Sequence, residues 1–247
     1  MDRRLILVFV LFLALLIAFI STIYISELKN MDQLRVEYPG LKEVVYSYRK
    51  DSLKVWAINM VLSFTIPVVF LISGLSQRIS YMVGKDRNLF LSGLLYGIVF
   101  FGLVFIISLP FDFYSSFVLK HRYGLTDQTF LRWLELNLKR FVVGDLAFSL
   151  FLWLPYYVIY TSPKSWWLKI GLLLIPIVIF IVFISPMVID PIFNKYTSIK
   201  DDNLGQQIQV LLDEAEVGDA DIYKVDKSKD TNTMNAYMTG IFDSKRI

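Results

Sequence analysis

Long apolar segments alternate with shorter polar ones along the first three quarters of the chain. The apolar segments cover residues 5–25, 55–75, 89–109, 141–160 and 171–189. Each has about 20 residues, and a helix that rises about 1.5 Å per residue crosses the roughly 30 Å of hydrocarbon in a bilayer at that length. The pattern therefore predicts five transmembrane helices, with the lipid bilayer as the first partner of the protein.

A different periodicity precedes the fourth apolar segment. Gly124 is a turn residue, and Thr126 or Asp127 is expected to cap the helix that follows. Apolar side chains then recur at helical spacing, at Phe130, Leu134, Leu138 and Phe141, with charged residues between them. This pattern predicts an amphipathic helix that leads into the fourth membrane helix.

The chain becomes polar after residue 189. A helix is expected after Asp201 and Asp202, followed by strands at 221–226 and 233–238 and by a turn at 242–245 into a third strand. The predicted fold class is an all-α polytopic membrane protein, with about five transmembrane helices and an amphipathic helix, followed by the start of a small α+β domain. The boundaries are 1–189 for the transmembrane region and 190–247 for the second domain, which contains a helix and a β-hairpin.

Composition excludes several kinds of chemistry. Apolar residues make up 55% of the 247 residues, and the net charge is only +3, so the chain lacks the basic surface of a nucleic-acid-binding protein. The absence of cysteine excludes disulfides, thiolate metal sites and a cysteine nucleophile. A single histidine, His121, cannot supply the two histidines of the commonest zinc-hydrolase site. No catalytic residue and no metal ligand are assigned within the chain.

Lysine and arginine positions predict the orientation in the membrane. The N-terminus and the two loops on its side carry seven of the 25 basic residues, namely Arg3, Arg4, Arg78, Lys85, Arg87, Lys164 and Lys169. The first loop, the third loop and the tail carry the other 18, because 25 − 7 = 18. Since basic residues are enriched on the cytoplasmic side, the tail is expected in the cytoplasm.

Three motifs, in order, resemble those of a known family. They are "HRYGLTDQTFLRWLELNLKRFVV" at 121–143, "ISPMVIDPIFNKYTSIKDDNLGQQI" at 184–208 and "VDKSKDTNTMNAYMTGIFDSKRI" at 225–247. Together, behind five membrane segments, they are similar to the type I CAAX prenyl proteases, which are integral-membrane zinc metallopeptidases with an HExxH motif. The resemblance covers nearly the whole chain from about residue 55 onward.

The resemblance implies a function and a set of substrate-binding residues. It implies that Asn235, Ala236 and Tyr237 line the substrate cleft, on a strand to which an extended peptide or protein substrate adds. In the family the zinc helix follows the segment that resembles 245–247. The chain is therefore expected to be the N-terminal part of the protease, truncated before the zinc helix and inactive alone. Zinc is expected in the full-length protein and not in this chain.

Other functions and residue roles remain open. A catalytically silent scaffold or substrate-binding module is one alternative, and a transporter is a weaker one. Asp145 lies inside the fourth apolar segment, where it either lines a water-filled chamber or pairs with a basic residue. His121 is expected to face solvent or headgroups, and Ser228 with Lys229 resembles a catalytic dyad in letters only, because adjacent strand residues point to opposite faces. The membrane is that of bacteria or of the endoplasmic reticulum.

Overall fold

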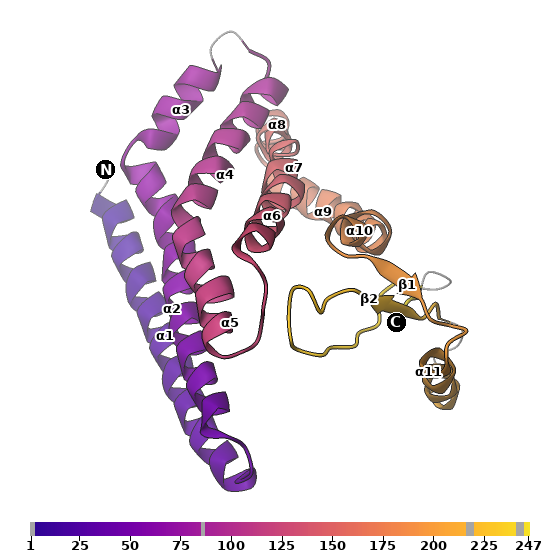
Figure 1. The fold of residues 1–247 in the computed structure, drawn as a ribbon. Coiled ribbons are helices and arrows are strands. Elements are labelled where there is room, and N and C mark those ends of the chain that lie inside the picture. Colours follow the sequence, from indigo (N-terminus) through magenta and orange to yellow (C-terminus); the bar gives the residue numbers. More distant parts are fainter. Residues whose placement is uncertain (1–2, 85–86, 216–219, 241–244) are drawn as a thin grey trace. The chain divides into compact units, whose positions relative to one another are not determined.

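A computed structural model describes residues 3–84, 87–215, 220–240 and 245–247, and helices predominate in it (Figure 1). In chain order the helices are α1 (Arg3–Glu37), α2 (Glu43–Ile72), α3 (Leu75–Gly84), α4 (Leu89–Phe113), η1 (Tyr114–Val118), α5 (Leu119–Arg122), α6 (Phe130–Arg140), η2 (Phe141–Leu146), α7 (Ala147–Ser149), α8 (Trp153–Thr161), α9 (Trp166–Ile184), η3 (Ser185–Ile189), α10 (Asp190–Phe193) and α11 (Asn203–Glu214). The η elements are single wide turns of π-helix. The strands are β1 (Tyr196–Ser198) and β2 (Tyr223–Val225).

The five predicted membrane helices are confirmed. Helical segments long and apolar enough to cross a bilayer cover Leu7–Glu37, Glu43–Ile72, Leu89–Arg122, Phe130–Thr161 and Trp166–Phe193. Most of them run well beyond the predicted apolar segments, because polar residues continue a helix outside the hydrocarbon. The predicted amphipathic helix is α6, and it continues through η2 into the fourth of these segments.

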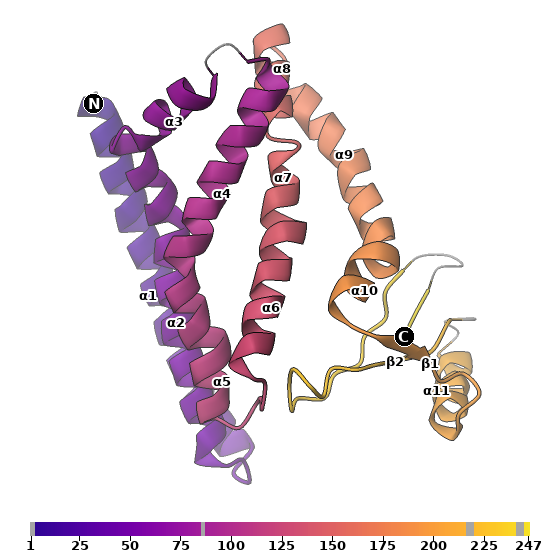
Figure 2. The same ribbon diagram turned by 45° about the horizontal axis from the view of Figure 1, so that its top comes forward.

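Contacts within the chain divide it into two units, and the first contains Met1–Lys85 with Leu103–Tyr123. In this unit α1 and α2 lie side by side in both ribbon views (Figures 1 and 2). Phe12 packs edge to face on Phe64 with ring centroids 5.2 Å apart, and the Arg49 guanidinium lies 2.6 Å from the Glu27 carboxylate. An exposed ion pair contributes at most about 1 kcal/mol, so packing of apolar side chains holds this hairpin together.

The second unit contains Asp86–Gly102 with Gly124–Ile247, and small residues let two of its helices approach closely. A Cβ atom on Gly97 of α4 would lie 2.8 Å from the Cβ of Ser149 in α7, and one on Gly93 would lie 2.8 Å from the Cβ of Trp153. Ser149 is fully buried. Such close approach increases van der Waals contact between membrane helices. This contact is important because lipid tails are as apolar as the helix surfaces, so the hydrophobic effect does not drive membrane helices together.

The tail forms a small core of its own within the second unit. Ile199, Leu212 and Ile222 are buried together, and α11 passes so close to this core that a Cβ on Gly205 would overlap the Ile199 carbonyl oxygen. The strands β1 and β2 pair antiparallel, with Tyr196 opposite Val225. The expected helix after Asp202 is confirmed as α11.

The predicted β-hairpin of the tail is corrected by the structure. The strand expected at 221–226 is present as β2, but its antiparallel partner is β1 and not the segment 233–238. That segment has no strand structure, and pairing starts only at Thr239, which exchanges two backbone hydrogen bonds with Arg246. Ile247 pairs with Asp221 and Tyr223, as a third strand would. Most of the predicted turn at 242–245 lies outside the described residues.

Substitution of Gly97 tests the close helix contact. Gly97→Ala is expected to destabilise the protein by about 1 to 3 kcal/mol, because its methyl group meets Ser149 and forces the helices apart. Gly102→Ala on the same helix is the matched control, since nothing lies within 4 Å of its Cβ position. It should be neutral or stabilising by up to about 1 kcal/mol. Thermal unfolding in detergent measures both, and equal effects would contradict the contact.

Candidate functional site

The Arg132 guanidinium connects three segments of the second unit. Its Nε and Nη2 donate to the two carboxylate oxygens of Asp230, at 2.9 and 3.1 Å, and Nη2 also donates to the Phe193 carbonyl oxygen at 3.3 Å. The Asp230 side chain is only 8% exposed. A bidentate arginine–carboxylate pair is among the stronger polar contacts in proteins and sets orientation as well as distance. It therefore ties the 226–233 loop to α6 and to the end of α10.

The loop before α6 holds the same tail loop from the other side. The Gln128 side-chain amide donates to the Asp230 carboxylate at 3.0 Å, and the Thr126 hydroxyl donates to the Asp230 backbone carbonyl at 3.0 Å. The Asn232 backbone N–H donates to the Leu125 carbonyl at 2.9 Å. Both Thr126 and Gln128 are buried, so these hydrogen bonds are shielded from water.

The predicted helix cap is corrected at this loop. Thr129, not Thr126 or Asp127, caps α6, since its hydroxyl accepts a hydrogen bond from the Arg132 backbone N–H at 3.3 Å. Thr126 bonds Asp230, and the Asp127 carboxylate accepts from the Asn232 side-chain amide at 2.8 Å. The sequence analysis considered two caps, Thr126 and Asp127, and long-range contacts engage both of them.

Two effects compete in setting the pKa of Asp230. Burial alone would raise this pKa, but hydrogen bonds from Arg132 and Gln128 favour the charged carboxylate and bring the pKa below its usual range. A carboxyl with a lowered pKa in the folded state stabilises the protein at pH values above its unfolded pKa. That contribution is lost as the pH falls through the folded pKa.

The predicted substrate-binding residues lie just beyond this anchored loop. Asn235, Ala236 and Tyr237 are all exposed, and the neighbouring Met234 is fully exposed. Within the described part of the chain, no backbone hydrogen bond to another backbone group involves residues 234–238. Their backbone donors and acceptors are therefore available to another chain.

Tyr237 connects this segment to the start of β1. Its hydroxyl lies 3.3 Å from the hydroxyl of Tyr196, whose ring packs edge to face on Tyr223 with centroids 6.3 Å apart. Burial first, and the bond with Tyr237 second, raise the pKa of Tyr196, so its hydroxyl keeps its proton. Sequence patterns had not singled out Tyr196, because its importance comes from a residue 41 positions away.

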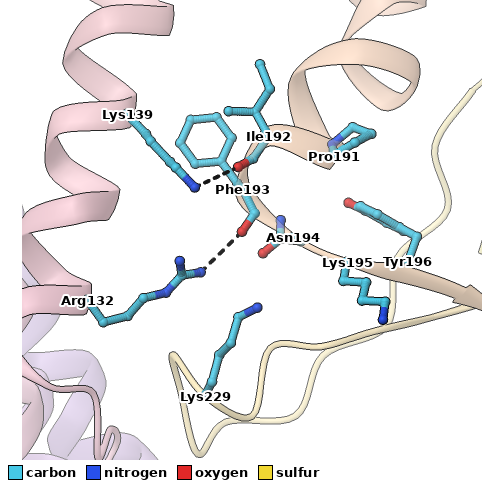
Figure 3. A pocket seen from close by; sticks show the side chains of 9 residues that line it. All are labelled: Arg132, Lys139, Pro191, Ile192, Phe193, Asn194, Lys195, Tyr196 and Lys229. Atoms are coloured by element: carbon cyan, nitrogen blue, oxygen red, sulfur yellow. Dashed lines mark hydrogen bonds between the residues drawn. The ribbon is translucent and has the colours of Figure 1, made fainter.

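Tyr196 also lines a pocket of about 530 Å³ at the end of α10 (Figure 3). The pocket is lined by Arg132, Lys139, Pro191, Ile192, Phe193, Asn194, Lys195, Tyr196 and Lys229. Lys139 of α6 donates to the Ile192 carbonyl oxygen at 3.1 Å, beside the bond from Arg132 to Phe193. Among the described residues, four basic side chains and no acidic one line this space.

The remaining candidates from the sequence are His121, Asp145 and the pair of Ser228 with Lys229. The His121 Nδ1 is 2.8 Å from the Phe117 carbonyl oxygen, which makes Nδ1 the protonated nitrogen. Asp145 is exposed on η2 and has no ion-pair partner among the described residues, so the structure shows no pair of the kind considered for it. Lys229 bonds Asp226 at 3.2 Å and not Ser228.

The residues that the structure describes do not fit a zinc ion. Zinc hydrolases hold their metal with three protein ligands, usually including two histidines. In the part of the chain that the structure describes, no three His, Cys, Asp or Glu side chains come together in a possible metal site. No catalytic step through a metal is therefore derived for these residues.

Membrane-crossing helices followed by a small α+β tail define a polytopic membrane protein, and similar proteins give its family. The sequence model described as CAAX prenyl protease N-terminal, five membrane helices, matches residues 43–195. A metalloprotease of Bacillus subtilis, itself described as uncharacterized, is 31% identical over 203 residues, which are 82% of this chain and 47% of the relative. The chain belongs to the CAAX prenyl protease N-terminal family.

Other relatives agree with this family. CAAX prenyl protease 1 of Saccharomyces cerevisiae is 31% identical over 148 residues, which are 58% of this chain and 32% of the yeast protein. The crystal structure of S. mikatae Ste24p superposes with a TM-score of 0.67 at 25% identity, covering 81% of this chain and 48% of that one. The chain spans about half the length of the Bacillus subtilis relative and a smaller part of the yeast protein.

Acidification tests the Arg132–Asp230 pair. Asp230→Asn should lower the free energy of unfolding at pH 7 by about 1 to 3 kcal/mol, because a shielded guanidinium loses its charged partner. Asp226→Asn is the matched control on the same loop, since its pair with Lys229 is exposed, and it should cost less than about 1 kcal/mol.

The difference between wild type and Asp230→Asn should persist down to about pH 4 and shrink below it, as the wild-type carboxyl becomes protonated. Thermal unfolding of the three proteins between pH 7 and pH 3 measures this. A pH-independent difference, or an equal effect of both substitutions at pH 7, would contradict the assignment.

Proposed function

We propose that the chain forms the membrane-embedded, substrate-binding part of a zinc metalloendopeptidase that cleaves peptide bonds of prenylated or membrane-associated substrates. The family match and the metalloprotease relatives support the reaction class. One observation carries the role of this chain: residues 234–238 are exposed and make no backbone pairing in the described structure. Since the described residues do not fit a zinc ion, the role is substrate binding and not the hydrolytic step.

The segment is held at both ends while its middle stays accessible. On one side Asn232 is bonded to Leu125 and Asp127, and on the other Thr239 is paired with Arg246. Fixing both ends lowers the conformational entropy that a substrate must remove on binding. An extended peptide can then add to the segment through its main chain, which gives affinity without demanding one sequence.

Asn235 would add selectivity for an extended substrate. Its side-chain amide has both donors and an acceptor, and it is exposed without a hydrogen-bond partner among the described residues. Tyr237 is oriented by its contact with Tyr196, so it offers an ordered aromatic surface next to the same substrate. Ala236 between them is small enough to let a peptide backbone come close.

Substitution of Asn235 tests this function in the protein expressed from its complete reading frame. Loss of a hydrogen bond that leaves a buried substrate group unpaired costs about 1 to 3 kcal/mol. Asn235→Ala should therefore lower kcat/KM for a farnesylated peptide by roughly five- to 150-fold, with zinc content unchanged. Peptide turnover and metal analysis of the same preparation are the measurements.

Asn203→Ala is the matched control, because Asn203 is an exposed asparagine of the tail whose side-chain bond, among the described residues, is to Gln207 of its own helix. It should change turnover by less than twofold. Turnover of Asn235→Ala within twofold of wild type would overturn the role of the segment. A zinc-loaded wild-type protein that cleaves no peptide would overturn the protease function itself.

We further propose that the first loop, the third loop and the tail face the cytoplasm, either in bacteria or at the endoplasmic reticulum. The bias of 18 basic residues against seven supports this orientation. The chain contains no cysteine, so single cysteines report sidedness without background. Cysteines in place of Gly40 and Ser198 should be labelled together by an impermeant reagent added from the cytoplasmic side. A cysteine in place of Ser165 should be labelled only from the opposite side, and labelling of Ser165 together with Ser198 would contradict the topology.

A further inference from the structure

The pocket beside α10 contains more positive charge than its structural contacts require. Arg132 is engaged by Asp230 and Glu135, and Lys139 by Glu135 and the Ile192 carbonyl. Lys195 has no partner for its ammonium group among the described residues. Among the described residues, the ion-pair partner of Lys229 is Asp226, whose side chain is 51% exposed. Two lysines from separate segments are thus available to a ligand.

The site occurs where two membrane helices leave the hydrocarbon. Arg132 and Lys139 lie in the first turns of the segment Phe130–Thr161. Residues 191–193 end the segment Trp166–Phe193, and residues 194–196 follow it. These two segments cross in opposite directions, so the start of one and the end of the other share a side. That is the depth at which lipid headgroups lie, within reach of basic side chains.

The chemistry of the lining matches a phosphate group. Lysine ammonium groups bind phosphate as point charges, and the Tyr196 hydroxyl and the Asn194 amide also line the space. In Figure 3, Lys229 reaches from its loop toward Asn194, on the side of the pocket where the Arg132 guanidinium lies. A volume of about 530 Å³ is within the range of small-molecule sites and admits a headgroup. We propose that this pocket binds the phosphate of an anionic phospholipid headgroup, with Lys195 and Lys229 as its charged ligands.

A double substitution separates this site from general surface charge. Lys195→Gln with Lys229→Gln removes the two available cations and leaves Arg132, Asp230 and the α10 contacts intact. Lys200→Gln with Lys224→Gln is the matched control, because both are exposed tail lysines outside the pocket and the change in charge is equal. The probe is phosphatidylglycerol, titrated into the purified 247-residue chain in detergent and followed by native mass spectrometry.

The pocket variant should bind phosphatidylglycerol about 10- to 30-fold more weakly than wild type, since each lysine near a lipid surface contributes a factor of about five. The control variant should stay within twofold. An equal loss in both variants, or in neither, would overturn the proposal. If the double variant unfolds, Lys195→Gln alone should still weaken binding about fivefold, and an unchanged affinity of this single variant would equally overturn it.

Competition with a soluble phosphate identifies the source of the ligand. Glycerol 3-phosphate at millimolar concentration should not displace phosphatidylglycerol if the site takes its phosphate from the bilayer. Displacement that is lost in the pocket variant would support the phosphate site and assign it to soluble phosphates. The readout is lipid binding by the chain itself, so it succeeds or fails independently of any peptidase activity.

Discussion

Arg132 joins three segments that lie far apart along the chain. Its guanidinium holds Asp230, which is 98 residues away, and the carbonyl of Phe193, which is 61 residues away. The Asp230 side chain is almost fully shielded from water. Removal of either partner would therefore leave an unpaired, shielded charge, which destabilises the folded protein. These contacts therefore fix the end of α10, the tail loop and α6 relative to one another. The exposed segment 234–238 follows this loop, and the three elements supply residues to the pocket.

The same contacts explain why α6 is basic on this side. The chain turns to extended backbone at Asn194, so the carbonyls of Ile192 and Phe193 lose their helical partners. Lys139 and Arg132 supply the missing donors, and positive charge is also favourable at the negative end of a helix dipole. Part of the charge around the pocket is thus structural, and only the lysines outside this arrangement are available for a ligand.

The pairing of β2 explains why the 233–238 segment forms no strand in this fold. Pairing of β2 with β1 on one edge, and of Asp221 and Tyr223 with Ile247 on the other, leaves no edge of β2 for this segment to join. In the described structure the backbone of residues 234–238 makes no hydrogen bond to another backbone group, as at the unpaired edge of a sheet. Tyr237 still reaches Tyr196, so the segment is positioned by a side-chain contact and not by a β-ladder.

The sequence by itself determined the features that depend on local chemistry. Runs of about 20 apolar residues predict membrane helices, because hydrocarbon forces each backbone group to bond within its own helix. Helical spacing likewise predicted α6, and the order of motifs indicated the family.

Only the tertiary structure decided how distant residues are paired. No local pattern could show that Thr126 and Asp127 bond the tail loop instead of capping α6, or that β2 pairs with β1 and not with 233–238. Likewise, no local pattern could show that Arg132 pairs with Asp230 or that the Tyr196 hydroxyl contacts the Tyr237 hydroxyl. These choices depend on which segments the fold brings within about 3 Å of each other, and hydrogen bonds at that range carry no periodic signature in the sequence.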